Sequence, residues 1–261
     1  MIQTIRFINH SGFLVETDQA ILVFDYFTDP AAVLADLAAD DRPFVFFVSH
    51  AHYDHWNLGI FDFEAKERPI YVLDESCRET LEEDENLSPE DGTFYVRPGS
   101  IVEFSEALTA QTGIESIRTF GSTDEGVSFL VRAGEEWIYH AGDLNDWDWQ
   151  DEDSAEMERS YRTELKRFRE ALDEFRAEPY VAFVPVDQRL EDTAFSGALI
   201  LLEYMKPELL VPMHLNGGRE LPAQLAEELQ KHPQLAGNTK VLEMNTSGQI
   251  SDRDGNWIDE T

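Results

Sequence analysis

Residues 44–55 read FVFFVSHAHYDH, an unbroken apolar run followed by three histidines and an aspartate. The apolar part, 44–48, contains only Phe and Val and predicts a buried β-strand. His50, His52, Asp54 and His55 follow in the next loop. In α/β proteins, functional sites usually lie in loops at the carboxyl ends of strands. The chain has only seven histidines, so this concentration of them indicates a specific role.

The spacing within this stretch is typical of a metal site. Alternate residues of an extended segment point the same way, so His50 and His52 can reach one ion. Asp54 and His55 lie past the bend, where they can face a second ion. Imidazole and carboxylate suit Zn²⁺, Mn²⁺ or Fe²⁺, and zinc is favoured. The sequence therefore predicts one or two divalent transition metals; the alternative is a turn whose histidines only form hydrogen bonds.

The rest of the first half predicts short strands separated by turn residues. We expect a short acidic helix at 75–83 and a loop at 87–92. The further strands are expected at 4–8, 13–16, 20–25, 70–73, 93–97, 101–104, 116–120, 127–131 and 137–140.

After residue 143 the apolar spacing changes to three and four residues, which predicts a long helix with one packing stripe from Met157 to Phe175. Buried strands are expected at 181–186 and 209–213, and helices at 194–205 and 222–232. The polar stretch 247–261 is expected to wrap the surface. Interleaved helices and strands of this kind predict sheets covered by helices.

Composition narrows the possible partners. The formal net charge is −33, from 53 acidic and 20 basic residues. Such a field repels phosphate backbones and argues against a nucleic-acid substrate, although local arginines can still bind a small anion. The single cysteine, Cys77, excludes an internal disulfide, and no apolar run approaches a membrane span of about 18 residues. We expect a cytoplasmic protein with a small-molecule substrate and no membrane partner; its oligomeric state stays open.

The arrangement His-x-His-x-Asp-His after a hydrophobic strand resembles the signature of the metallo-β-lactamase superfamily. Segment 21–25 resembles that family's early strand, whose final aspartate supports the metal loop. YHAGD at 139–143 and VPMH at 211–214 resemble the strands that present a bridging aspartate and a ligand of the second metal. These two phrases are most similar to the branch containing ascorbate-6-phosphate lactonase-like proteins.

The resemblance runs from residue 4 to residue 216. It implies an α/β fold, a four-layer αββα sandwich, with 1–261 forming one domain. It implies Asp54 as general base and the metal ligands His50, His52, Asp54, His55, Asp143 and His214.

One departure from the family pattern concerns the first metal. The family's third motif supplies a histidine at a glycine-containing turn, and here 120–126 reads FGSTDEG, with no histidine between His55 and His140. The first site therefore lacks one ligand. Water, Asp124, His140 or His10 are the candidates to replace it, with His140 also readable as a hydrogen-bonded core residue.

His10, Arg189 and Trp147 are further candidates for substrate binding, each with a neighbouring residue or turn that bears on it. His10 lies at a turn between two predicted strands and can face the cleft. Asp187 and Arg189 follow the strand 181–186 and can meet a polar substrate group, since arginine binds carboxylate or phosphate, or they can form a surface ion pair. Trp147 and Trp149 follow Asp143 and can cover the cleft or simply pack.

The sequence as a whole predicts a metal-dependent hydrolase that acts on a lactone, ester, amide or phosphodiester through an activated water. A di-iron oxidoreductase of the same fold is one alternative. A non-catalytic metal- or ligand-binding protein is another, since the first site lacks a ligand.

Overall fold

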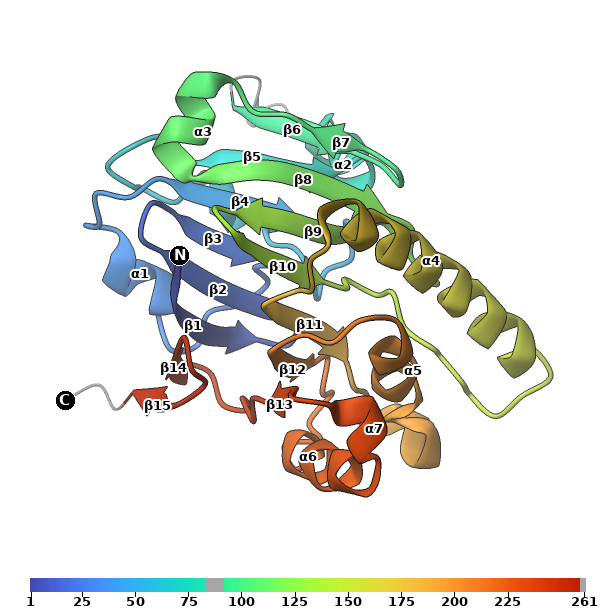
Figure 1. Cartoon of the computed structure of the whole chain (residues 1–261). Helices are drawn as coiled ribbons and strands as arrows, with labels where there is room; N and C mark the ends of the chain where they lie inside the picture. The colour runs from blue at the N-terminus through green and yellow to red at the C-terminus, as the bar shows by residue number, and fades with distance from the viewer. Residues whose placement is uncertain (83–91, 259–261) are drawn as a thin grey trace.

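The computed structural model describes residues 1–82 and 92–258. In this part of the chain, two mixed β-sheets face each other and helices cover their outer sides (Figure 1). The first sheet has the strand order β15-β14-β1-β2-β3-β4-β5-β6, and the second has the order β13-β12-β11-β10-β9-β8-β7. The predicted αββα architecture is confirmed.

The first sheet is built mainly from the N-terminal third of the chain. Its strands are β1 (Ile2–Asn9), β2 (Gly12–Thr17), β3 (Ile21–Phe24), β4 (Phe44–Val48), β5 (Ile70–Asp74), β6 (Thr93–Val96), β14 (Ile250–Asp252) and β15 (Trp257–Ile258). Its helical elements are α1 (Val33–Leu37), the 3₁₀ turn η1 (Leu58–Phe61) and α2 (Ser76–Glu82).

The second sheet contains β7 (Ile101–Val102), β8 (Ile114–Phe120), β9 (Ser128–Ala133), β10 (Glu136–His140), β11 (Val181–Pro185), β12 (Leu209–Met213) and β13 (Lys240–Val241). The helical elements of this half are α3 (Glu106–Thr112), α4 (Ser154–Phe175), η2 (Gln188–Thr193), α5 (Ser196–Tyr204), α6 (Leu221–Lys231) and α7 (Pro233–Ala236).

The burial of strand β4 on both faces explains why its sequence is apolar throughout. Val45 and Phe47 belong to the large core between the sheets, whereas Phe44, Phe46 and Val48 belong to the smaller core on the outer face. Both faces are buried, so the strand has no polar alternation.

Several expected elements differ from the structure. The tail does not only wrap the surface, because residues 250–252 pair with β1 and extend the first sheet. The helix expected at 194–205 begins at Ser196 and is preceded by η2, where Glu191 has a φ of 54°. Helices α1 and α3 were not expected, and the loop expected at 87–92 lies, apart from Gly92, outside the described residues. Within those residues, no helix combines the length and hydropathy needed to cross a bilayer.

Candidate metal centre

The candidate site lies where parallel strands of both sheets end. Strands β3 and β4 are parallel, as are β10, β11 and β12. The residues that follow these strands converge at one edge of the sandwich, because parallel strands present their carboxyl ends on the same side. They are Asp25 after β3, His50 after β4, Asp143 after β10, Asp187 after β11 and His214 after β12.

The loop that carries His50–His55 is fixed by Asp25. Its carboxylate accepts hydrogen bonds from the Ser49 backbone N–H (2.8 Å) and from the Ser49 hydroxyl (2.7 Å). The same carboxylate lies 2.8 Å from His55 Nδ1. All three residues are fully buried. The loop therefore enters the site in one conformation, as the resemblance implied for segment 21–25.

Two glycines allow neighbouring turns to approach this loop. Gly126, in the β8–β9 turn, has a φ of +74°, and a Cβ there would lie 2.0 Å from the Ser49 carbonyl oxygen. Gly142 has a φ of +54° and would place a Cβ 2.7 Å from Ser49 Cβ. Both positions exclude a side chain. The turn that carries Asp143 can therefore pack directly on the loop that carries His50.

Asp143 lies between two groups of potential ligands. Its Oδ2 is 3.6 Å from His50 Nε2. Its Oδ1 is 3.0 Å from His55 Nε2 and 3.6 Å from His214 Nε2. One oxygen faces each group, which is the geometry needed for a carboxylate that bridges two ions.

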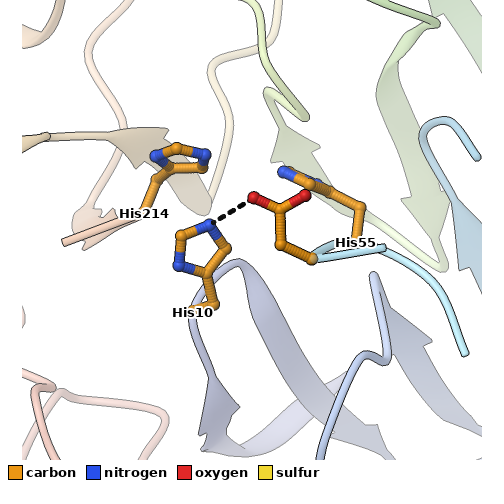
Figure 2. Close-up of side chains that lie close together, drawn as sticks. His10, His55 and His214 are labelled. Atoms are coloured by element: carbon orange, nitrogen blue, oxygen red, sulfur yellow. Dashed lines mark ion pairs between the residues drawn. The ribbon is translucent and has the colours of Figure 1, made fainter. Parts of the chain in front are cut away.

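The donor atoms form two groups in which all members lie within 4.8 Å of one another. The first group is His50, His52 and Asp143, and the second is His10, Asp54, His55 and His214. In the first, His50 Nε2 and His52 Nδ1 are 3.0 Å apart. Figure 2 shows His10, His55 and His214 of the second group close together, and its fourth member, Asp54, has Oδ2 3.5 Å from His10 Nε2.

The inner histidines are oriented for ligation. The Nδ1 atom of His50 is held by the Ser49 hydroxyl (2.9 Å), and that of His55 by Asp25. His214 Nδ1 lies 2.9 Å from Asp187 Oδ2. In each case Nε2 is left to face the site, and such partners fix the tautomer of a ligating histidine.

A test of whether these residues fit a metal ion comes from unsatisfied polar atoms. His55 Nε2, His10 Nε2 and Asp143 Oδ1 are buried and form no well-directed hydrogen bond within the described residues, although His55 Nε2 and Asp143 Oδ1 are 3.0 Å apart and His10 Nε2 lies 3.5 Å from Asp54 Oδ2. Buried polar atoms are normally fully paired. Together with the other members of the two groups, these atoms form a set of nitrogen and oxygen donors that suits a divalent transition metal.

The protonation states of the site residues are compatible with a bound divalent metal ion. Burial and the neighbouring His55 lower the pKa of His50 to about 4, so its ring is neutral at pH 7. Burial opposes the charged form of His55, but Asp143 and Asp25 outweigh it and raise its pKa to about 10. Although Asp143 is buried, the surrounding histidines hold its pKa well below the usual range. A metal would replace the His55 proton, because a ligating imidazole must be unprotonated.

None of the three residues proposed as a replacement ligand joins the first group, and His10 belongs to the second. His140 lies in the core, where its Nε2 is 2.9 Å from the Ser11 carbonyl oxygen and its Nδ1 accepts from the Gly142 N–H. With both ring nitrogens engaged, the ligand hypothesis for His140 is wrong and the core interpretation is correct. Asp124 lines the adjacent cavity, where burial and then Asp143 raise its pKa, but it is outside both donor groups.

A cavity of about 390 Å³ opens beside the two groups. Trp147 and Trp149 stack with ring centroids 6.3 Å apart, and the Trp147 Nε1–H donates to the Asp143 carbonyl oxygen at 2.9 Å. Met157, from the stripe expected only to pack, also borders this space. The lining residues are His52, Tyr53, Asp54, Thr123, Asp124, Asp143, Trp147, Trp149, Met157, Arg189 and His214.

Asp187 is buried behind His214, whereas Arg189 is partly exposed at the cavity. Asp187 is fully buried and accepts hydrogen bonds from Asn216 Nδ2 (2.7 Å) and Arg189 Nη2 (2.6 Å), besides its contact with His214. The suggestion that Asp187 meets substrate is therefore wrong. Arg189 has about half of its side chain exposed and borders the cavity, with its guanidinium 5.7 Å from the Trp149 ring centroid.

Comparisons with known proteins agree with this geometry. Two curated proteins, each named a UPF0173 metal-dependent hydrolase, are similar to the chain. The one from Salinibacter ruber is 23% identical over 80% of this chain and 83% of its own length. The one from Pyrobaculum arsenaticum is 26% identical over 81% and 84%.

Solved structures share the fold. Igni18, a metallo hydrolase from Ignicoccus hospitalis, superposes with a TM-score of 0.68 at 18% identity, covering 97% of this chain and 98% of its own. The metallo-β-lactamase fold protein YhfI from Bacillus subtilis gives 0.59 at 14% identity, covering 97% and 100%. The closer resemblance to ascorbate-6-phosphate lactonase-like proteins stays a prediction.

A family model described as the beta-lactamase superfamily domain matches residues 4–160, which is more than half of the chain. This segment includes the loop of His50–His55 and Asp143. The chain belongs to the beta-lactamase superfamily.

Proposed function

We propose that the chain is a metal-dependent hydrolase of a small molecule. The observation that carries the proposal is the convergence of two groups of histidine and aspartate donor atoms, the atoms of each group within 4.8 Å of one another, beside an open cavity. The names of the two curated relatives, both metal-dependent hydrolases, support the same activity.

The residues divide into two roles. His50, His52, Asp143, Asp54, His55 and His214 hold one or two divalent metals, with zinc favoured over manganese and iron by the nitrogen-rich donor set. When bound, the metal lowers the pKa of a water molecule towards neutrality and polarises the bond to be cleaved. Asp54, which is partly exposed to the cavity, orients that water and accepts its proton as general base.

The cavity walls indicate what the substrate contacts. Trp147 and Trp149 offer an apolar, planar surface, and Arg189, whose guanidinium is paired with Asp187 at 2.6 Å, borders the same cavity. A guanidinium binds carboxylate or phosphate groups. A lactone, ester, amide or phosphodiester that carries a negative group fits this arrangement. The overall charge of −33 disfavours a nucleic acid.

Metal content followed by a substrate panel tests the proposal. We expect the purified protein to contain at least one transition metal per chain and to hydrolyse a member of a panel of lactones, esters, amides and phosphodiesters. A folded protein that stays metal-free after incubation with Zn²⁺, Mn²⁺ or Fe²⁺ overturns it.

The same nitrogen and oxygen donors also accept iron. A di-iron oxidoreductase is therefore the second candidate, and iron content together with oxygen reactivity would favour it. A metal-loaded protein that is inactive on every substrate would favour a non-catalytic binding protein.

A further inference from the structure

His10 lies in the turn between β1 and β2, and its backbone is held in an uncommon conformation. Its φ is +53°, in the left-handed region that few residues other than glycine adopt. Strained backbone of this kind tends to occur at functional sites. His214, on the opposite sheet, also has a positive φ, of 59°.

The turn is fastened from several sides. The backbone N–H of His214 donates to the His10 carbonyl oxygen at 3.1 Å. The His140 ring nitrogen lies 2.9 Å from the next carbonyl oxygen, that of Ser11. At Gly12 a Cβ would come within 2.9 Å of the carbonyl oxygens of Asn9 and Asp25, so the chain is tightly enclosed. The direction of the His10 side chain is therefore fixed by contacts from both sheets.

The fixed ring points into the second donor group (Figure 2). His10 Nε2 is buried, has no hydrogen-bond partner within the described residues, and lies 3.5 Å from Asp54 Oδ2. Its ring centroid is 4.1 Å from that of His214 and 5.7 Å from that of His55. These are the positions expected of side chains that share one ion.

A substrate contact for His10, which the sequence suggested, fits the structure less well. His10 is not among the residues that line the 390 Å³ cavity, which Asp54 and His214 border. It borders a separate cavity of about 370 Å³, together with Asn9 and Asn216. A substrate held beside the tryptophans would meet the metal and Asp54 before it could meet His10.

We propose that His10 is a metal ligand through Nε2. It gives the second group three imidazoles and the Asp54 carboxylate, in addition to the shared Asp143. The β8–β9 turn lacks the histidine that would complete the first group. His10, from the β1–β2 turn, then supplies an additional donor to the second group. The inference rests on the proposed function in one respect, that the chain binds a transition metal.

Zinc affinity of a His10→Asn variant tests this proposal. Asparagine tolerates the left-handed conformation but is too short to replace the imidazole. We expect zinc affinity, measured by competition with a chromophoric chelator, to fall at least about tenfold, because even second-sphere partners of a ligand contribute that much. The visible absorption of bound Co²⁺ should change as well. His232→Asn, at a helix end beside Glu228, should change neither.

The outcomes separate this inference from the proposed function. Wild-type zinc affinity and an unchanged Co²⁺ spectrum in His10→Asn would overturn the ligand role, and a rise in KM alone would assign His10 to the substrate. A wild-type protein that binds no metal would overturn both proposals.

A measurement on the wild-type protein avoids the question of whether the variant folds. X-ray absorption with one equivalent of Zn²⁺ should fit three imidazoles. A fit to two would contradict a ligand role for His10.

Discussion

The two donor groups differ in how they are built. The first takes His50 and His52 from one loop and shares Asp143, and His52 is exposed. The second takes its donors from the β1–β2 turn, the loop after β4 and the end of β12, and its buried members are oriented by Asp25 and Asp187. Oriented ligands bind more tightly because less freedom is lost on binding. The difference teaches that a metal site depends on the residues that hold its ligands as much as on the ligands.

Asp54 offers the largest effect, because it belongs to the second group and is also the proposed base. Asp54→Asn keeps the shape of the side chain but removes its charge. We expect kcat/KM for the best substrate of the panel to fall at least about a hundredfold, the scale of general-base loss. The exposed Asp62→Asn is the matched control. Activity within a few-fold of wild type would remove Asp54 from the mechanism.

Asp187→Asn tests whether a residue that only orients a ligand affects metal affinity at the second group. The carboxylate orients His214 at 2.9 Å, and its loss should weaken metal binding at the second group by about tenfold to a hundredfold. Chelator competition measures the change, and Asp192→Asn, exposed on the same 3₁₀ turn, is the control. Equal loss from both groups would show that Asp187 supports the fold in general, contrary to the account.

Asp124→His should produce the smallest effect. Asp124 lies in the turn where the family places its third histidine, and it borders the cavity with His52 and Asp143. An imidazole there should strengthen the weaker of two metal-binding steps severalfold, as calorimetric titration would show. If the tighter step changes instead, the assignment of the groups is reversed.

Much of the fold could be predicted because its strands are buried on one or both faces and bounded by turn residues. The unbroken apolar run of β4 and the three- and four-residue apolar spacing of α4 were clear signals, and Tyr161, Leu165 and Phe168 are buried as expected. Helix α3 was missed although Ser105 caps it by accepting from the Leu108 N–H. Its short sequence has little apolar spacing, so only the cap could have indicated it.

The site could be predicted where its donors are close in sequence, as in His50–His55. The grouping of His10 with His214 could not, because it depends on a turn of one sheet meeting a strand end of the other. The role of Asp187 was missed for the same reason. Its sequence position beside Arg189 suggested an exposed pair, whereas the fold buries it beneath His214.

A crystal structure of the protein with one equivalent of Zn²⁺, read from an anomalous-difference map, tests the central claim most directly. We expect one strong peak among Asp54, His55 and His214, with His nitrogens at about 2.0–2.1 Å, and a weaker peak or none between His50 and His52. A strong peak only at His50 and His52, or no peak in either group, would contradict it.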